Sequence, residues 1–251
     1  MKIDPIHQFN IEPLFTIGHI GNQTIAFTNS SLYMFVAVAL ISILMIGGSA
    51  GRQLVPGRFQ SMAEISYEFI ASTIRSTAGA EGMKFFPLIF CLFMFICVSN
   101  LVGIIPYTFT ISSHIIVTAA LALLVFFLVL IYGIYKNGLK FFSIFVPKGV
   151  PGYIVPLVMF IEILSFLLRP VSHSVRLFAN MLAGHIALKV FAGFVAMLGV
   201  SLGALGWIGG IAPLALTVAL TALELLVAFL QAYVFAILTC IYLNDALHPG
   251  H

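Results

Sequence analysis

A row of polar side chains runs through one of the most apolar parts of the chain. Glu162, Arg169 and Arg176 are spaced seven residues apart, which places them on one stripe of a helix. His173 and Asn180 flank this stripe, four residues after Arg169 and Arg176. An arginine inside a long apolar segment is costly to keep and cannot release its proton. These residues therefore indicate a function that depends on charged groups inside an apolar segment.

Residues of a different kind follow further along the chain. His185 and Lys189 are four residues apart, while Glu224 and Gln231 are seven apart and share one helix face, with Thr221 near it. Histidine and glutamate can bind and release protons near neutral pH once their surroundings tune them, whereas arginine cannot. A path with titratable groups at both ends and a fixed positive charge between them passes no proton straight through.

Arg176 would attract a mobile carboxylate. At 4 Å and an effective dielectric constant near 20, the attraction between unit charges is about 4 kcal/mol. A carboxylic acid that arrives beside Arg176 would therefore lose its proton. No acid of this chain is placed to move past Arg176, so the mechanism requires a partner that supplies the carboxylate.

The same side chains also have structural explanations. Interhelical hydrogen bonds, which contribute about 0.6 kcal/mol on average, would explain Asn180 or Gln231 alone. Snorkelling toward the membrane surface would explain Glu162, Arg169 or Lys189. Two helices need one or two amides to hold together, however, and this set is larger. Ionisable groups within membrane spans mark ion pathways by default.

The composition describes an integral membrane protein. The chain has 251 residues, of which 61% are hydrophobic and 8% charged, with a mean hydropathy of +1.15; soluble domains carry about 25% charged residues. The net charge of +3 is scattered, with no basic run that would indicate nucleic-acid binding. Cys91, Cys97 and Cys240 lie in apolar segments without metal-ligand spacing, so we expect no metal site.

We expect an all-α membrane protein forming a single membrane domain over residues 1–251, with five membrane-embedded helices and one amphipathic surface helix. The predicted segments are an external segment (1–30), a first span (31–47), the surface helix (57–80), a helix pair (84–135) and a tilted helical hairpin (153–245). Ser112 or Ser113 can cap the second helix of the pair.

The predicted hairpin is unusually long. The first apolar stretch would make roughly 70 Å of helix, against a hydrocarbon core of about 30 Å. It is therefore either two helices or one long helix lying far from the bilayer normal. The turn GALGWIGG joins it to a second over-long helix, which indicates a strongly tilted pair.

The surface helix is predicted from its helical spacing of apolar and charged residues. Glu64 and Glu68 share its polar side. Its expected apolar side is formed by Met62, Ile65, Phe69 and Ile70.

Lysine and arginine in the connections predict the orientation, because these residues favour the cytoplasmic or matrix side. They gather in two connections that fall on the same side of the membrane, and the turns 106–112 and 199–212 have none. The N-terminus is then external and the C-terminus internal. The residues of the two connections are Arg52, Arg58, Arg75 and Lys84, and Lys136, Lys140 and Lys148.

The stretches RPVSHSVRLFANMLAGHI and ELLVAFLQAYVF resemble the a subunit of the F-type rotary ATP synthase, in its alphaproteobacterial or mitochondrial form. The resemblance covers most of the chain, including SNLVGIIPYTF within the helix pair. It implies that Arg176 faces a ring of c subunits and separates two aqueous half-channels. Asn180 and Gln231 match polar neighbours of that arginine, and Glu162 matches an acid near the cytoplasmic or matrix half-channel.

The resemblance also implies roles on the other side of the membrane. His185 and Glu224 match a coupled pair in the external half-channel, in the order typical of mitochondrial and alphaproteobacterial members. Asn100 falls in a stretch that lines the same half-channel. Further candidates for the proton path, with buried or snorkelling roles as the alternative, are His173, Arg169 and His114.

The expected function is that of a proton-translocating stator subunit that couples proton flow to rotation of the c ring; the alternative is a self-contained proton-coupled transporter. The chain has no GxxxxGK[ST] motif, so we expect no active site and no cofactor of its own. Expected partners are the c ring, peripheral-stalk b subunits, the rest of the ATP synthase and lipids. The expected location is the bacterial inner membrane, or alternatively the mitochondrial inner membrane.

Overall fold

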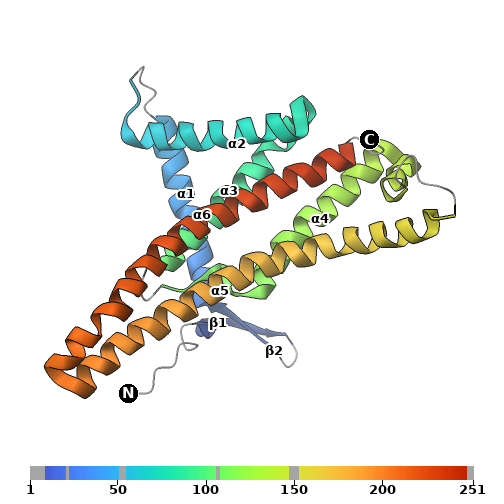
Figure 1. Ribbon diagram of the computed structural model, residues 1–251. Coiled ribbons are helices and arrows are strands. Elements are labelled where there is room, and N and C mark those ends of the chain that lie inside the picture. Colours follow the sequence, from blue (N-terminus) through green and yellow to red (C-terminus); the bar gives the residue numbers. More distant parts are fainter. Residues whose placement is uncertain (1–8, 21–22, 51–54, 106–107, 147–152, 248–251) are drawn as a thin grey trace. The chain divides into compact units, whose positions relative to one another are not determined.

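The computed structural model describes residues 9–20, 23–50, 55–105, 108–146 and 153–247, which are mainly helical (Figure 1). Within these residues, five helices are long and apolar enough to cross a membrane. The predicted all-α membrane fold is thereby confirmed. Arg52 and Lys148, used above for the orientation, lie outside the described residues. The helices are α1 (Asn29–Ala50), α2 (Arg58–Gly82), α3 (Phe86–Ile104), α4 (Ile115–Asn137), α5 (Val155–Gly209) and α6 (Ile211–Leu247), with short 3-10 turns η2 (Met83–Phe85), η3 (Ile111–Ser113) and η4 (Gly138–Phe145).

A β-hairpin precedes the first helix, which the sequence patterns did not predict. Strand β1 (Pro13–Ile20) pairs antiparallel with β2 (Gln23–Thr28), with register irregularities between Pro13 and Phe15 and between Thr16 and Gly18. The rings of Phe15 and Phe27 stack at 4.9 Å on this hairpin. The segment predicted only as external and polar therefore has a regular backbone.

The chain forms two compact units, and helices α1, α3, α5 and α6 each contribute to both. The first unit contains the β-hairpin, η3 and the parts of α5 and α6 nearest their connection. The second contains α2, α4, η4 and the outer parts of α5 and α6. The first comprises Met1–Ile41, Phe95–His114 and Leu177–Gln231, and the second Ser42–Met94, Ile115–Arg176 and Ala232–His251.

Helix α5 resolves the choice between two helices and one. It is helical from Val155 through Pro170 up to Gly203, where φ is 55° and the backbone leaves helical geometry, and a short helical piece follows that ends at Gly209. Glycine adopts a positive φ without the steric penalty of a side chain. Gly210 then connects α5 to α6, and the two helices run antiparallel within each unit (Figure 1).

Helix α2 buries one side against the rest of the protein. Of the residues predicted to form its apolar side, Ile70 is fully buried, whereas Met62 and Ile65 are 56% and 67% exposed. Small side chains form much of the buried stripe, because they let neighbouring elements approach closely. The buried hydrophobic residues of α2 are Ala63, Ile70, Ala71, Ile74 and Ala78.

Candidate functional site

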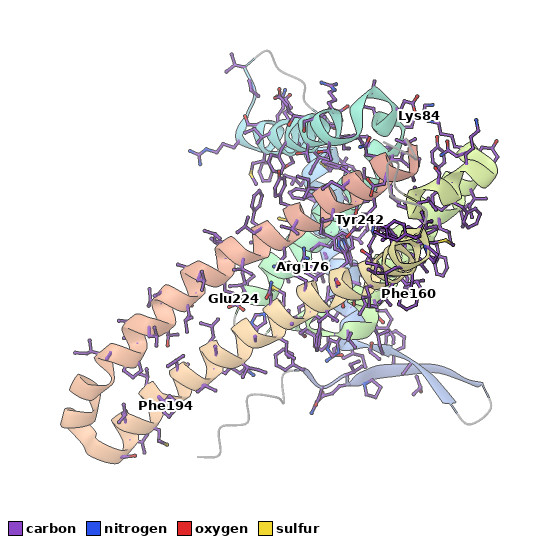
Figure 2. The ribbon with its side chains drawn as sticks, turned by 45° about the vertical axis from the view of Figure 1, so that its right-hand side comes forward. Lys84, Phe160, Arg176, Phe194, Glu224 and Tyr242 are labelled. Carbon is purple, nitrogen blue, oxygen red and sulfur yellow. The ribbon has the colours of Figure 1, made fainter. Side chains whose placement is uncertain are left out.

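His185 on α5 and Glu224 on α6 form a buried pair in the first unit; Figure 2 labels Glu224 on its helix. Both residues are largely buried, with 6% and 5% exposure. The Nδ1 atom of His185 lies 3.3 Å from the Oε1 atom of Glu224. Within the described part of the chain, neither carboxyl oxygen of Glu224 has a hydrogen-bond partner. Buried carboxyl groups normally have hydrogen-bond partners. The imidazole nitrogen 3.3 Å away is placed to exchange a proton with this carboxyl group.

Gly184 makes room for this pair. A Cβ atom at Gly184 would lie 2.8 Å from Oε1 of Glu224, which is too close for a real contact. The absence of a side chain lets the carboxyl group of α6 reach the backbone of α5. Small residues allow this kind of close approach between membrane helices.

A turn and the end of α3 support the pair from the other side of the imidazole. Oγ1 of Thr110 lies 3.0 Å from Nε2 of His185. Asn100, which is fully buried, donates from Nδ2 to the carbonyl of Ala228 on α6 at 3.2 Å. Ser112 donates its hydroxyl to Oδ1 of Asn100 at 2.5 Å. Asn100 thus connects α3, η3 and α6 around the pair.

The expected capping role of Ser112 and Ser113 is wrong. Helix α4 begins at Ile115, and both serines lie in η3. The hydroxyl of Ser112 bonds to Asn100, and that of Ser113 donates to the carbonyl of Thr110 at 2.6 Å. Local side-chain to backbone bonds of this kind compete with helix capping, and a tertiary partner takes the other hydroxyl.

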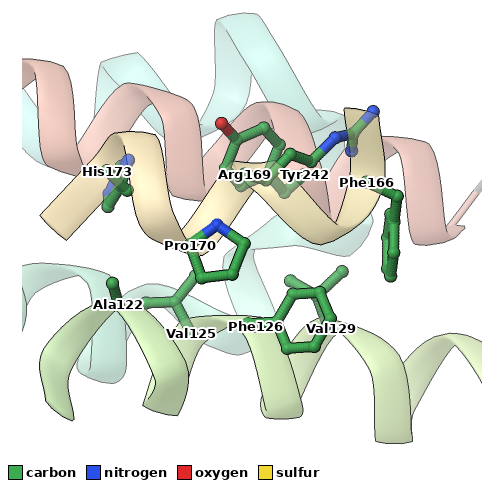
Figure 3. Close-up of a pocket in the computed structure, with 9 residues that line it drawn as sticks. All are labelled: Ala122, Val125, Phe126, Val129, Phe166, Arg169, Pro170, His173 and Tyr242. Atoms are coloured by element: carbon green, nitrogen blue, oxygen red, sulfur yellow. The ribbon is translucent and has the colours of Figure 1, made fainter. Parts of the chain in front are cut away.

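A second ionic contact joins α5 and α6 in the second unit. Arg169 donates from its guanidinium to Oδ2 of Asp245 at 3.0 Å. The guanidinium also lies 4.8 Å from the ring centre of Tyr242 and 5.5 Å from that of Phe166. Arg169, Tyr242 and His173 line a small cavity above α4 (Figure 3) of ≈ 10 Å³, about the space of one water molecule.

His173 lies in the same unit and is 5% exposed. Its ring centre lies 3.8 Å from that of Phe235, and its Nε2 atom has no hydrogen-bond partner among the described residues. The next residue, Ser174, shares a 3.1 Å hydrogen bond with Thr118 of α4. His173 is therefore packed rather than ion-paired.

Arg176 is exposed on α5, whereas His173 and Leu177 on the same helix are buried. No carboxylate in the described part of the chain forms an ion pair with its guanidinium. Its side of the helix carries exposed small residues at helical spacing. They are Ser165, Ser172, Ala179 and Ala183, and Asn180 is exposed one turn after Arg176.

Three further residues of the predicted proton path lie on α5, on α6 and just before α4. Glu162 on α5 and Gln231 on α6 are half-buried. His114 precedes α4; its ring stacks on Phe109 at 4.8 Å, and its Nε2 atom has no hydrogen-bond partner in the described residues. The structure thus brings His185 and Glu224 together, bonds the buried Asn100 to α6 and η3, and leaves Arg176 on an exposed helix face.

The sequence patterns missed several members of these clusters. Thr110 and Tyr242 carry no signal, because a single threonine or tyrosine in an apolar stretch is ordinary. Asp245 could have been found because it is an acid at the end of the last apolar helix, and ionisable residues in such segments usually pair with an opposite charge. Ser112 was predicted only as a possible helix cap.

Comparison with known proteins identifies the family. The family described as ATP synthase A chain matches residues 31–244. The ATP synthase subunit a of Bradyrhizobium diazoefficiens is 88% identical over 251 residues, covering 100% of both chains. Those of Rhodopseudomonas palustris and Nitrobacter winogradskyi are 78% and 76% identical over 249 residues, covering 99% of this chain and 100% of each relative. The chain belongs to the ATP synthase A chain family, the proton-channel subunits in the membrane sector of F-type ATP synthases.

Proposed function

We propose that Arg176 is the fixed charge of the channel and faces a carboxylate on the rotating c ring. The observation that supports this role best is the exposure of Arg176 on a helix face of small residues. Small side chains let a neighbouring helix approach closely, and an exposed arginine at membrane depth needs a counter-charge. A carboxylate on a partner helix would supply that charge.

The buried pair is proposed as the proton uptake side. Protons would pass Glu224 and His185, with Asn100 holding the surrounding turn, and protonate the ring carboxylate. After rotation, the ring carboxylate would meet Arg176 and release its proton toward Glu162. Each proton that moves down 100 mV yields about 2.3 kcal/mol. Asn180 and Gln231 would contact the ring carboxylate as polar neighbours of Arg176.

The fixed charge of Arg176 would make protons travel on the c ring, because it would prevent them from passing directly between the two half-channels. A guanidinium keeps its charge at any physiological pH, so it repels a cationic proton carrier while it attracts the carboxylate of the ring. Direct passage between the two half-channels would thus be blocked at Arg176. His173, Arg169 and His114 would line or support the paths without carrying the main proton flow.

The proposed setting is the bacterial inner membrane. The partners would be the c ring, the b subunits of the peripheral stalk and surrounding lipids. The ATP chemistry would belong to other subunits, and this chain would have no active site of its own. A self-contained transporter would instead need two related halves with matching broken helices; the polar stripe lies in the second half of the sequence alone.

The test uses the whole complex reconstituted in liposomes. Arg176→Ala should abolish ATP-driven proton pumping, measured with a pH-sensitive dye, because the ring carboxylate loses its counter-charge. Arg75→Ala is the matched control, since Arg75 is an exposed arginine on α2, and it should pump normally. Normal pumping by Arg176→Ala in complexes with a full complement of this subunit would refute the proposal.

A further inference from the structure

We propose that Thr110 is a positioning residue that selects the tautomer of His185. The inference rests on the proposed role of His185 and Glu224 in proton uptake. The hydroxyl of Thr110 would turn between Nε2 of His185 and the carbonyl of Gly103. Its direction decides whether the Nδ1 atom that faces Glu224 can accept a proton.

The geometry gives Thr110 one hydrogen and two competing acceptors. Its Oγ1 atom lies 3.0 Å from Nε2 of His185 and 3.4 Å from the carbonyl oxygen of Gly103. Thr110 is 2% exposed, so bulk water does not compete for the hydroxyl. A neutral imidazole carries a hydrogen on one nitrogen and accepts on the other. Whatever Thr110 does at Nε2 therefore sets the state of Nδ1.

When the hydroxyl points to Gly103, its oxygen accepts the hydrogen of Nε2. Nδ1 then has a free lone pair 3.3 Å from Oε1 of Glu224. A protonated Glu224 can pass its proton to Nδ1, which leaves a carboxylate and an imidazolium; the reverse step restores both neutral groups. No hydrogen on Nε2 or Thr110 has to move during this exchange.

When the hydroxyl points to His185, Nε2 accepts and the hydrogen sits on Nδ1. The neutral ring can then only donate a hydrogen bond to Glu224. Its Nδ1 has no lone pair to accept a proton, and losing its hydrogen would leave an imidazolate. This orientation therefore stops proton exchange between the two residues. The two states differ in the direction of the hydroxyl and in which ring nitrogen carries the hydrogen, so passing between them requires both a rotation of the hydroxyl and the move of one ring hydrogen between Nε2 and Nδ1.

The turn around Thr110 is built for this contact. A Cβ atom at Gly103 would lie 2.8 Å from Cγ2 and 3.0 Å from Oγ1 of Thr110, so glycine is needed to bring the carbonyl within reach. The carbonyl of Thr110 accepts from the hydroxyl of Ser113 at 2.6 Å and from its backbone amide at 3.3 Å. These bonds hold the backbone while the hydroxyl stays free to rotate.

Other groups around His185 do not replace this role. The charged or titratable groups that face the imidazole are Glu224 from α6 and Lys189, one turn further along α5. The ring of Phe9 lies 6.4 Å away and has no hydrogen-bonding group. In the part of the chain that the structure describes, Thr110 is the group with a rotatable hydrogen that contacts Nε2.

The experiment compares Thr110→Val with Thr110→Ser in the reconstituted complex. Proton flux driven by an imposed pH gradient is measured at a series of pH values. Valine keeps the shape and removes the hydroxyl, so we expect flux to fall about tenfold, the rate equivalent of one buried hydrogen bond, with an altered pH profile. Serine keeps the hydroxyl and should restore both. If Thr110→Val does not assemble, Thr110→Ala takes its place.

Thr108→Val is the matched control. The hydroxyl of Thr108 bonds to the carbonyls of Val102 and Ile105 in the same turn, at 2.6 and 2.7 Å. If Thr108→Val lowers flux and changes the pH profile as much as Thr110→Val, the effect belongs to the turn and the inference is overturned. Wild-type flux and pH profile in Thr110→Val, or an equal loss in Thr110→Ser, would overturn it as well.

Glu224→Gln, measured in parallel, separates this inference from the proposed function. If Glu224→Gln keeps full flux, the uptake path itself is wrong. If it loses flux while Thr110→Val retains the wild-type profile, the path stands and the tautomer role of Thr110 is rejected.

Discussion

Helices α5 and α6 meet through ionisable side chains in both units, and the two contacts differ in chemistry. In the first unit, His185 and Glu224 are 6% and 5% exposed, and both can gain or lose a proton. In the second unit, Arg169 and Asp245 pair at 3.0 Å with side chains 22% and 36% exposed. The first contact has a carboxyl group without a hydrogen bond among the described residues, and the second has one that is bonded.

The two contacts suit different tasks: one can exchange a proton, and the other can hold α5 and α6 together. An arginine stays charged throughout, and Tyr242 and Asp245 both stabilise that charge, by a cation–π contact and an ion pair. The Arg169 contact therefore holds the helices together in one charge state. The His185 contact can redistribute a proton, because each member has a neutral form. The same two helices thus carry one contact suited to transport and one suited to stability.

The largest expected effect is on proton flux, and it distinguishes Glu224 from Asp245. Glu224→Gln keeps the volume and removes the exchangeable proton, so proton flux through the reconstituted complex should fall by about 10²-fold, the lower range for loss of an acid–base group. Asp245→Asn should lower flux far less, because Asp245 is paired with a cation that cannot accept a proton. Equal losses in a dye-based flux assay would erase the distinction between the two contacts.

A smaller effect should come from moving Glu224 without changing it. Gly184→Ala places a Cβ atom 2.8 Å from Oε1, and the flexible end of the glutamate can shift away at little cost in stability. The carboxyl group would then leave Nδ1 of His185, and we expect flux to drop about tenfold, the equivalent of about 1.4 kcal/mol in the barrier.

Gly209→Ala serves as the control for Gly184→Ala. Among the described residues, none lies within 4 Å of a Cβ atom at Gly209, on the same helix. Both variants should assemble to the same level, judged by the amount of this subunit in the purified complex. Full flux in Gly184→Ala would mean that the 3.3 Å approach of the pair is not required.

The smallest effect concerns the Arg169 contact. Arg169→Lys keeps the positive charge but loses the planar group that lies over Tyr242. Because the pair is partly exposed, its contribution is near 1 kcal/mol or less, so the temperature at which this chain leaves the purified complex should fall by about 2–4 °C. ATP-driven pumping at moderate temperature should change little. A large loss of pumping with an unchanged release temperature would assign Arg169 to transport.

The helical class and the polar stripe followed from patterns that depend on local spacing. Glu162, Arg169 and Arg176 stand seven residues apart, so they share a helix face whatever surrounds them. The length of the apolar stretch after Tyr153 left open whether it makes one helix or two. The structure has one helix from Val155 up to Gly203, and a local pattern does not decide this because helices in proteins depend on tertiary contacts more than on propensity.

Other features had no local signal. The β-hairpin depends on pairing between strands that are each too short to persist alone. The buried side of α2 depends on which neighbour it meets, so the spacing of the apolar residues could not show that Ile70 is buried while Met62 and Ile65 are exposed. Thr110 and Asp245 joined their clusters through partners 75 and 76 residues away in the chain.

The sequence by itself determined the membrane class, the family resemblance and the types of group that could move a proton, because hydropathy, charge and motifs are properties of the residues themselves. Only the tertiary structure decided which groups touch. It placed Glu224 beside His185, turned Thr110 toward the same imidazole and paired Arg169 with Asp245, because contacts between distant segments are selected by packing and burial of the whole chain.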